Sequence, residues 1–164
     1  MTDLTTLAAR PDPVRLRLDC YPMRDEIAAR YGDMDTNRHL NNVALESLHE
    51  NARAVFSRSL RPGDSSLFDR GLRLVTSQRT THFLAEAHWP AMIATGAGAG
   101  RIGNTSYVVS TGLFCDGVCI SVCDAVTVVL DDDGPTPLPD DFRAALGTAL
   151  LGAPAQNPPP GPGA

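Results

Sequence analysis

Lysine is absent from this chain of 164 residues, so all 14 of its basic residues are arginine. They are outnumbered by 19 acidic residues, which gives a net charge of -5. A general nucleic-acid-binding protein needs a basic surface, so this balance argues against that class of function. An anionic ligand must instead find positive groups gathered locally. The lysine-free composition, rich in Ala, Gly and Pro, is typical of a GC-rich bacterial genome.

Long apolar runs are also missing. No stretch approaches the roughly 20 residues that a membrane-spanning helix needs, and residues 1–13 carry acids and prolines where a signal peptide would have an apolar core. We therefore expect a cytoplasmic protein with no membrane partner. With 43% hydrophobic and 20% charged residues, the chain fits one globular domain with a substantial core.

Cysteine is scarce, and its pattern does not indicate a metal site. Of the 4 cysteines, Cys115, Cys119 and Cys123 are evenly spaced with no histidine nearby, unlike the paired CxxC ligands of zinc sites. We expect buried thiols without disulfides, and no metal. No serine lies in the G-x-S-x-G context of a serine hydrolase, which disfavours that class of enzyme.

Polar side chains gather in residues 30–42, which contain Asp33, Asp35, His39 and several asparagines. Apolar residues then recur at three- and four-residue steps, as on one face of a helix: Leu40, Ala44, Leu48, Ala52, Val55 and Phe56. Groups that accept, hold or move protons are thus placed at the N-terminus of a helix over 41–60, which predicts an active site. A second interpretation is that Asp33, Asp35 and Asn41 only cap that helix.

Strand patterns surround the helix. We predict strands over 14–21 and 24–31 before it, and over 72–83, 89–101, 104–114 and 118–130 after it. Turn dipeptides, Gly103-Asn104 and Asp116-Gly117, separate the last three strands and predict an antiparallel meander. Gly96, Gly98 and Gly100 share one strand face, where missing side chains let the sheet bend or another segment approach closely.

These elements predict an α+β domain with one long helix against a curved, mainly antiparallel sheet. Residues 61–64 should stop the long helix, and 139–151 should form a short final helix. The expected organisation is a flexible arm over 1–13, a single domain over 14–151, and a disordered Pro/Gly-rich tail over 152–164.

Three acidic residues outside the polar stretch have open interpretations. Asp124 interrupts an apolar strand face, either at a bulge or solvent-facing end of the sheet, or as a second acid near a pocket. Glu46 and Glu50 lie along one side of the helix, where Arg53 can pair with Glu50. For these glutamates a solvated or ion-paired helix face is favoured over a catalytic role.

The run Asp33-Met34-Asp35-Thr36-Asn37-Arg38-His39-Leu40-Asn41-Asn42, followed by Glu50-Asn51-Ala52-Arg53 on the helix, resembles the start of hotdog-fold thioesterases. The stretch Arg101-Ile102-Gly103-Asn104-Thr105-Ser106 resembles a later turn of that family, and Pro137-Leu138-Pro139 is a frequent ending. The resemblance covers most of residues 24–150. It implies a hotdog fold, hydrolysis of an acyl thioester, and no bound cofactor or metal.

The resemblance also assigns the site. It implies that Asp35, Asn37, His39 and Asn42 are catalytic and that Arg101, Thr105 and Ser106 bind substrate. In a branch similar to 4-hydroxybenzoyl-CoA thioesterase, the acid matching Asp35 does the chemistry. In a branch resembling the plant acyl-ACP thioesterases, the residues matching Asn37 and His39 act with it.

Two departures from the family pattern concern this site. Many relatives have glycine where Arg38 stands, so we expect Asn37 to take the left-handed backbone conformation in its place. Residues 82–86 also replace a Tyr-Leu-Arg-Pro-like segment, which leaves the substrate contacts there open.

Thioester hydrolysis fits these residue types. The backbone amide of Asn42 at the helix N-terminus can hold the carbonyl oxygen as its negative charge grows. Asp35 can attack directly or activate water, while His39 and Asn37 orient that water or carry its proton to the departing thiolate. Arg101 is the expected contact for the phosphates of coenzyme A.

Three alternatives to an acyl-CoA thioesterase remain: an acyl-ACP thioesterase, a dehydratase of the same fold, and a protein that binds an acyl thioester without hydrolysing it. The His-Asp or His-Glu pairing usual in such dehydratases is not evident. A long strand such as 89–101, left unpaired at a sheet edge, would invite aggregation. We therefore expect a homodimer or higher homo-oligomer, with the pocket between subunits.

Overall fold

The computed structural model describes residues 8–60 and 67–152. Its strands and helices are β1 (Met23–Ala28), α1 (Asn42–Ser59), β2 (Arg73–Phe83), β3 (Met92–Ile102), β4 (Ser106–Cys115), β5 (Val118–Leu130) and α2 (Asp140–Thr148), with short 3-10 turns η1 (Pro13–Leu16), η2 (Leu18–Cys20), η3 (Tyr31–Asp33) and η4 (Leu67–Arg70). The helix stop expected at 61–64, and the arm and tail expected over 1–7 and 153–164, lie outside these residues.

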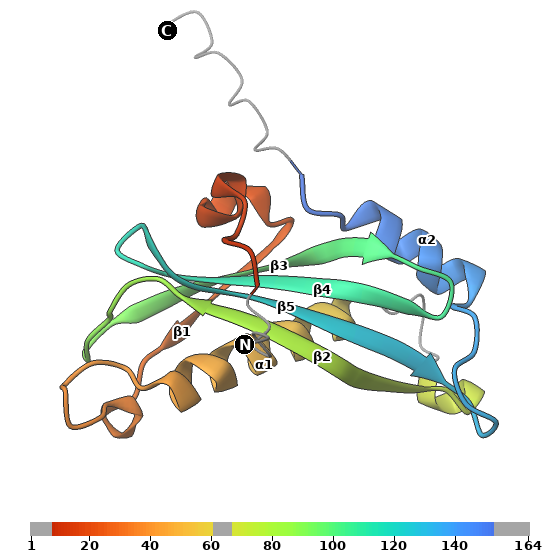
Figure 1. Ribbon diagram of the computed structural model, residues 1–164, viewed down its shortest axis with the longest axis horizontal. Helices are drawn as coiled ribbons and strands as arrows, with labels where there is room; N and C mark the ends of the chain where they lie inside the picture. Colours follow the sequence, from red (N-terminus) through yellow and green to blue (C-terminus); the bar gives the residue numbers. More distant parts are fainter. Residues whose placement is uncertain (1–7, 61–66, 153–164) are drawn as a thin grey trace, which may run out of the picture.

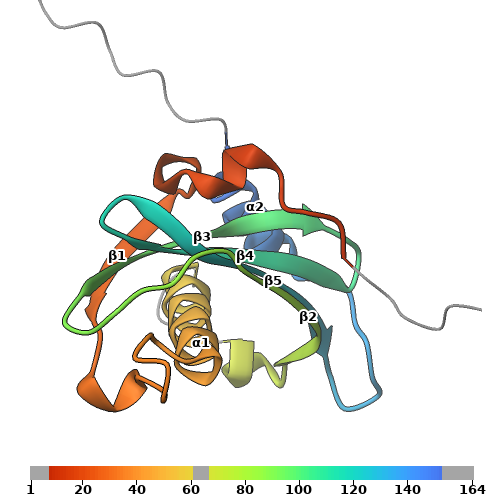
Figure 2. The same ribbon diagram turned by 60° about the vertical axis from the view of Figure 1, so that its left-hand side comes forward.

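One antiparallel sheet, in the order β1-β3-β4-β5-β2, curves around α1 (Figures 1 and 2). The predicted meander of the last three strands is confirmed. Asp116 (φ 50°) and Gly117 (φ 78°) close the β4–β5 hairpin with the two positive φ angles of a type I′ turn. The expectation that 89–101 is an unpaired edge is wrong, because β3 lies between β1 and β4; the edges are β1 and β2.

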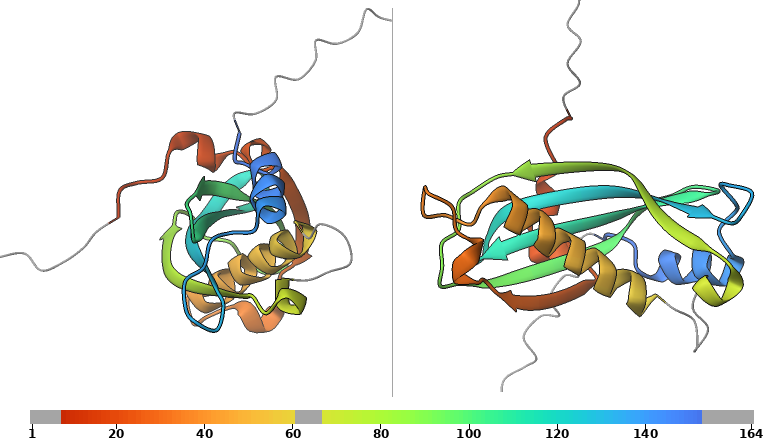
Figure 3. Two further views of the ribbon diagram at one scale, coloured as in Figure 1. Left: turned by 90° about the vertical axis from the view of Figure 1, so that its right-hand side faces the viewer. Right: turned by 90° about the horizontal axis from the view of Figure 1, so that it is seen from below.

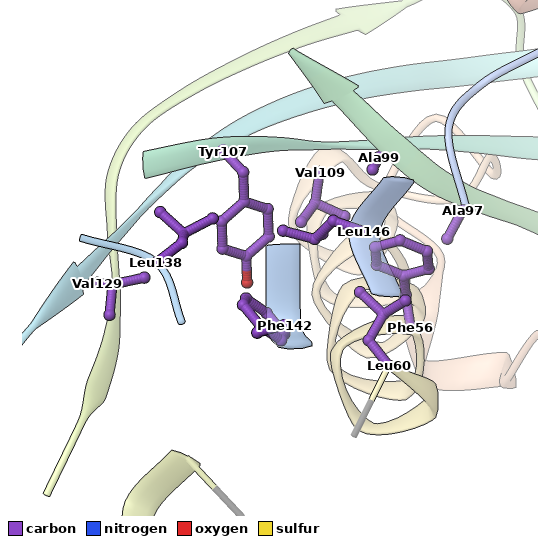
Figure 4. Close-up of a cluster of buried hydrophobic side chains, with 10 residues drawn as sticks. All are labelled: Phe56, Leu60, Ala97, Ala99, Tyr107, Val109, Val129, Leu138, Phe142 and Leu146. Carbon is purple, nitrogen blue, oxygen red and sulfur yellow. The ribbon is translucent and has the colours of Figure 1, made fainter. Parts of the chain in front are cut away.

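The core lies between the concave face of the sheet and α1, which crosses the strands (Figure 3). The face of α1 that is buried consists of Ala44, Leu45, His49, Ala52 and Phe56. Near the end of α1, Phe56 packs in one cluster with Tyr107 of β4 and with Phe142 and Leu146 of α2 (Figure 4). The predicted arrangement of one helix against one curved sheet is therefore confirmed.

The outer, convex face of the sheet is covered by residues 13–21, which form η1 and η2 and not the predicted strand. Asp12 begins the first turn, because its Oδ1 accepts a hydrogen bond from Val14 N at 2.9 Å and Pro13 has the φ that a helical turn needs. The alternation of apolar and charged residues in this segment fits a strand equally well. Asp12 and Pro13 favour the turn locally.

Tyr21 is fully buried on this outer face, above positions without side chains. A Cβ on Gly96 would lie 2.5 Å from Tyr21 Cγ, and one on Gly112 would lie 2.7 Å from Tyr21 Oη. At Gly98 a Cβ would meet Pro22 Cδ at 2.8 Å. Of the two alternatives for the β3 glycines, the close approach of another segment is found at Gly96 and Gly98, and not at Gly100.

Asp124 also lies on the outer face, remote from α1. Its Oδ1 accepts hydrogen bonds from Arg15 Nη1 at 2.9 Å and from Ser110 Oγ at 2.5 Å. It pairs in regular register with Ser110, so it marks no bulge. Asp124 therefore anchors the covering segment through Arg15.

Candidate active site at the N-terminus of α1

The loop between β1 and α1 is a hairpin closed by its own backbone. Met34 and Leu40 form an antiparallel bridge, Asp35 N donates to His39 O at 3.0 Å, and Arg38 N donates to Asp35 O at 3.1 Å. This is the pattern of a three-residue hairpin loop whose last residue is left-handed. That residue is Arg38, at φ 66°. The expectation for Asn37 is therefore wrong, because the turn geometry needs the left-handed residue immediately before His39.

Asp33 holds the base of this hairpin. Its carboxylate accepts hydrogen bonds from Arg30 N at 2.9 Å and Arg30 Nη2 at 2.9 Å, and its carbonyl accepts from Asn41 N at 2.9 Å. Burial acts to raise the pKa of the Asp33 carboxyl, but the hydrogen bonds and charge of Arg30 prevail and lower it. Asp33 is thus an ionised structural residue that ties the loop to the helix entry.

Asp35 is held in the turn and faces His39. Its Oδ1 accepts from Asn37 N at 2.8 Å, while its Oδ2 lies 3.5 Å from His39 Nδ1. Both side chains are about a quarter exposed, at 28% for Asp35 and 24% for His39. The carboxylate of Asp35 accepts no hydrogen bond from an amide of α1 within residues 8–60 and 67–152. The capping interpretation therefore does not account for Asp35.

Asn41 is the residue that caps α1. Its Oδ1 accepts from Ala44 N at 2.7 Å. Within the described ranges, the backbone amides of Asn42 and Val43 have no hydrogen-bond partner. Two free donors thus lie at the positive end of an 18-residue helix, where they favour a negative charge.

A hollow of about 240 Å³ is lined by Asn42, whereas Val43 is not part of its lining. Its walls include His39, Asn42 and Leu45 on one side and Phe83, Leu84 and Glu86 on the other. Asp35 is not part of this lining, so it reaches the hollow only through His39. The hollow combines an imidazole, free backbone donors and apolar walls, the mixture expected of a site for a largely apolar ligand.

The fold places the remaining candidate site residues in two separate regions. Asn37 is exposed, and only its backbone amide is engaged in the turn. Arg101, Thr105 and Ser106 lie at the β3–β4 turn, where Gly103 N donates to Ser106 O at 2.7 Å. This turn is at the end of β3 opposite to Met92, whereas the Asp35 loop is at the Met92 end. One chain does not bring the two groups together.

Glu46 and Glu50 are bound by arginines. Arg79 of β2 forms ion pairs with both glutamates, and Arg53 forms a second pair with Glu50. The hydrogen bond from Arg53 is the main cause of the lowered pKa of Glu50. The ion-paired interpretation of this helix face is confirmed.

His49 is a polar residue that the sequence interpretation missed. It is 1% exposed in the core, with Nδ1 2.7 Å from Thr111 Oγ1 and Nε2 2.9 Å from Ser121 Oγ. Its position four residues after Leu45 and seven before Phe56 places it on the buried helix face, which was the available signal. His88 was also left uninterpreted; its Nδ1 lies 2.8 Å from the carbonyl oxygen of Arg38.

No helix within the two described ranges is long and apolar enough to cross a membrane. Among the same residues, no group of three or more His, Cys, Asp or Glu side chains is placed to hold a metal ion.

Several solved structures share this architecture. A protein from Pseudomonas aeruginosa, PA5185, has 21% identity and a TM-score of 0.73 over 84% of this chain and 98% of its own. A thioesterase from Thermus thermophilus, solved with coenzyme A and Zn, has 22% identity and a TM-score of 0.69 over 78% and 93%. A thioesterase-superfamily protein from Jannaschia has 26% identity and a TM-score of 0.67 over 78% and 82%.

No curated protein matches the sequence. A family model does, over residues 29–146, and its span runs from just after β1 through the hairpin, α1 and the strands β2 to β5 into α2. The fold is the hotdog fold, with a long central helix wrapped by a curved antiparallel sheet. This chain belongs to the thioesterase-like superfamily.

Proposed function

We propose that the protein hydrolyses an acyl-CoA thioester to the free acid and coenzyme A in the hollow at the N-terminus of α1. The observation that carries this proposal is the free backbone amide of Asn42 beside His39 in one hollow. The similarity to a Thermus thermophilus thioesterase solved with coenzyme A supports the choice of carrier.

The amide of Asn42 receives the carbonyl oxygen of the thioester. Negative charge grows on that oxygen as the carbonyl is attacked, and a fixed N–H donor at a helix N-terminus stabilises it without reorganisation. Loss of one such donor usually costs about 3 kcal/mol in the transition state. Val43 N supplies a second donor one residue further along α1.

Asp35 and His39 prepare the attack. Water adds to the carbonyl carbon, the C–S bond breaks, and the proton released by the water reaches the thiolate, so that acid and thiol leave in balance. In the direct form, Asp35 removes the proton from the water. Alternatively, Asp35 attacks the carbonyl carbon and expels the thiolate, and water then hydrolyses the resulting acyl-aspartate anhydride to release the acid. In the relayed form, His39 takes the proton and Asp35 orients the imidazole. The relayed form is favoured because His39 lines the hollow and Asp35 does not.

The proposed assembly is a homodimer formed through β2. Among residues 8–60 and 67–152, this strand of 11 residues pairs only with β5, so its other edge has no strand partner there, and Val75 and Phe83 are exposed. A two-fold axis would pair the two β2 strands antiparallel, with Arg73 of one near Phe83 of the other.

Such a dimer also gives Arg101, Thr105 and Ser106 a route to the substrate. Antiparallel pairing brings the Arg73 end of one sheet to the Asn42 end of the other, and the β3–β4 turn lies at the Arg73 end. Arg101→Ala should then raise KM with little change in kcat. A KM that stays flat, with no response to salt, would place the phosphate contact elsewhere.

Release of free thiol from a panel of acyl-CoA substrates tests the proposed function. Wild type should turn over at least one member, and folded Asp35→Asn should lose kcat by orders of magnitude because it keeps its shape and loses its charge. A near-normal kcat in Asp35→Asn would remove this residue from the mechanism. The same acyl chain on acyl carrier protein decides the carrier, and an enoyl thioester checks for a dehydratase. Thermal stabilisation by acyl-CoA without thiol release would indicate a binding protein.

A further inference from the structure

Arg38 has a backbone conformation that its side chain makes costly. Its φ of 66° lies in the left-handed region, where an L-residue other than glycine is strained. Within the described ranges, Asp116 (φ 50°) is the other non-glycine residue with positive φ, and it lies in a hairpin turn that favours aspartate. Arginine has no such preference. The backbone at Arg38 would accept glycine with less strain.

The side chain of Arg38 makes no interaction with the described residues that would compensate for this strain. The backbone makes both interactions: Arg38 N donates to Asp35 O at 3.1 Å, and its carbonyl lies 2.8 Å from His88 Nδ1. The side chain is exposed and has no hydrogen bond or ion pair to any residue of 8–60 or 67–152. Glycine would preserve every contact that Arg38 makes.

Arg38 differs in its location from the other described arginines whose side chains have no partner. Among the described residues, Arg10, Arg58 and Arg101 also lack a side-chain partner. Arg10 precedes η1, Arg58 lies in the last turn of α1, and Arg101 lies at the far end of β3, from which only the proposed dimer would bring it to a hollow. Arg38 adjoins His39, which lines the hollow at the Asn42 amide.

The charge around the hollow explains why a cation at the position of Arg38 matters. The protein carries a net charge of -5, and Glu86 lies in the wall of the hollow. An anionic substrate therefore needs a local cation to approach. Arg38 supplies one on the hairpin, next in sequence to His39 in the wall of the hollow.

We propose that Arg38 determines substrate affinity by binding an anionic oxygen group of the thioester substrate. This inference rests on the proposed function, since it names a contact of the same site. Two sources of that group share the chemistry: a phosphate of coenzyme A, or a carboxylate at the end of the acyl chain. The strained backbone is retained because the guanidinium serves the ligand and not the fold.

Arg38→Gly tests the inference because the substitution should stabilise the fold while it weakens the binding of substrate. Relief of the left-handed strain should raise Tm by about 3 °C, while loss of the cation should raise KM about tenfold and flatten its dependence on salt. Arg38→Lys should keep most of the affinity and salt dependence and gain no stability. Arg58→Ala, which removes an equally free arginine from the far end of α1, is the matched control and should leave KM unchanged.

Two substrate comparisons identify the anion. A penalty in Arg38→Gly that disappears with the acyl-pantetheine, which has no nucleotide phosphates, indicates a phosphate of the carrier. A penalty confined to acyl chains with a terminal carboxylate indicates the acyl group. An unchanged KM in Arg38→Gly on every substrate that wild type turns over would overturn the inference and leave the proposed function intact.

Calorimetric titration with a non-hydrolysable thioether analogue of acyl-CoA separates the two hypotheses further. Wild type that releases no thiol but binds the analogue, with affinity lost in Arg38→Gly, contradicts hydrolysis and supports the role of Arg38. Wild type that neither hydrolyses nor binds contradicts both. Equal affinity in wild type and Arg38→Gly contradicts the role of Arg38 whatever the activity.

Discussion

His49 Nδ1 lies 2.7 Å from Thr111 Oγ1, which joins the middle of α1 to β4 through the core. The second ring nitrogen is 2.9 Å from Ser121 Oγ, and that hydroxyl donates to the carbonyl of His82 at 3.0 Å. Ser121 therefore accepts from Nε2–H. Because the lowered pKa of His49 keeps the ring neutral, Nδ1 accepts from the Thr111 hydroxyl, which also lies 3.4 Å from the carbonyl oxygen of Cys123. The neutral imidazole thus satisfies both hydroxyl groups at once.

His49→Ala should lower the free energy of unfolding by about 3 kcal/mol. The substitution leaves a cavity and an unpaired hydroxyl in the core, and each effect alone costs about 1–3 kcal/mol. Urea denaturation measures the loss. The double variant His49→Leu/Thr111→Val, which replaces the interacting pair with apolar groups, should recover most of it. Equal losses in the two variants would mean that packing, and not hydrogen bonding, dominates at this position.

The same histidine makes stability depend on pH. Burial, with smaller effects from the charges of Arg79 and Arg15, lowers the pKa of His49 from 6.5 to about 3. The unfolded chain therefore binds a proton below pH 6.5 that the folded chain does not bind until about pH 3. The stability contributed by His49 is complete above pH 6.5 and falls as pH decreases, by up to about 1.4 kcal/mol per unit.

The His49→Leu/Thr111→Val variant isolates this effect, since the carboxylates titrate alike in both proteins. The difference in unfolding free energy between wild type and this variant should shift against wild type from pH 7 to pH 4.5. A difference that is constant over this range would contradict the buried neutral imidazole.

Gly96→Ala should destabilise the protein by about 2 kcal/mol, because the new Cβ would lie 2.5 Å from Tyr21 Cγ and the buried ring has no space to move. Gly147→Ala is the matched control. It lies within α2 with no atom near its missing Cβ, so alanine should stabilise by up to about 1 kcal/mol through helix propensity. Thermal unfolding of the two variants should therefore move in opposite directions. A neutral Gly96→Ala would show that Tyr21 is not held against β3.

Asp124→Ala should release the segment that covers the outer face of the sheet. Arg15 is only 13% exposed, so removal of its partner leaves a mostly buried cation at a cost of about 2 kcal/mol. Trypsin should then cleave after Arg15 or Arg17 faster than in wild type. Thiol release should be unchanged, because Asp124 and the hollow lie on opposite faces of the sheet. A large loss of activity would support its interpretation as a second acid.

The elements that the sequence predicted well are those whose pattern depends on neighbours along the chain. The stripe from Ala44 to Phe56 needs only helical spacing, and Asp116-Gly117 specifies its turn by its own backbone preferences. The 14–21 segment was wrong because its alternation suits two structures and tertiary contacts choose between them: Arg15 finds Asp124 across the sheet, and Tyr21 finds the space above Gly96.

For the candidate site too, features set by neighbours in sequence were predicted and features set by the whole sheet were not. The motif placed Asp35, His39 and Asn42 around one helix start because they are adjacent in sequence. The order of the strands, which decides that β2 and not β3 is an edge, is a property of the whole sheet. Arg101 was expected to contact the phosphates of coenzyme A, but no local pattern records which end of a strand faces the Asp35 loop.

The last prediction separates direct from relayed catalysis. If Asp35 acts alone, His39→Ala and Asn37→Ala should each cost about tenfold or less in kcat, through the geometry of the loop. The geometry of the hairpin predicts instead that these two substitutions have unequal effects on kcat. His39 lines the hollow and lies 3.5 Å from the Asp35 carboxylate, whereas the Asn37 side chain is exposed and makes no hydrogen bond in the described part of the chain.

His39→Ala should therefore approach the loss of Asp35→Asn, while Asn37→Ala stays near wild type. The Asp35→Asn/His39→Ala double variant should lose little more than either single variant, because two groups that act as one unit are removed only once. Thiol release on one acyl-CoA, with circular dichroism and sedimentation to verify fold and assembly, measures all four variants. Additive losses at Asp35 and His39 would contradict a shared role, and a loss at Asn37 equal to that at His39 would return the amide to the catalytic group.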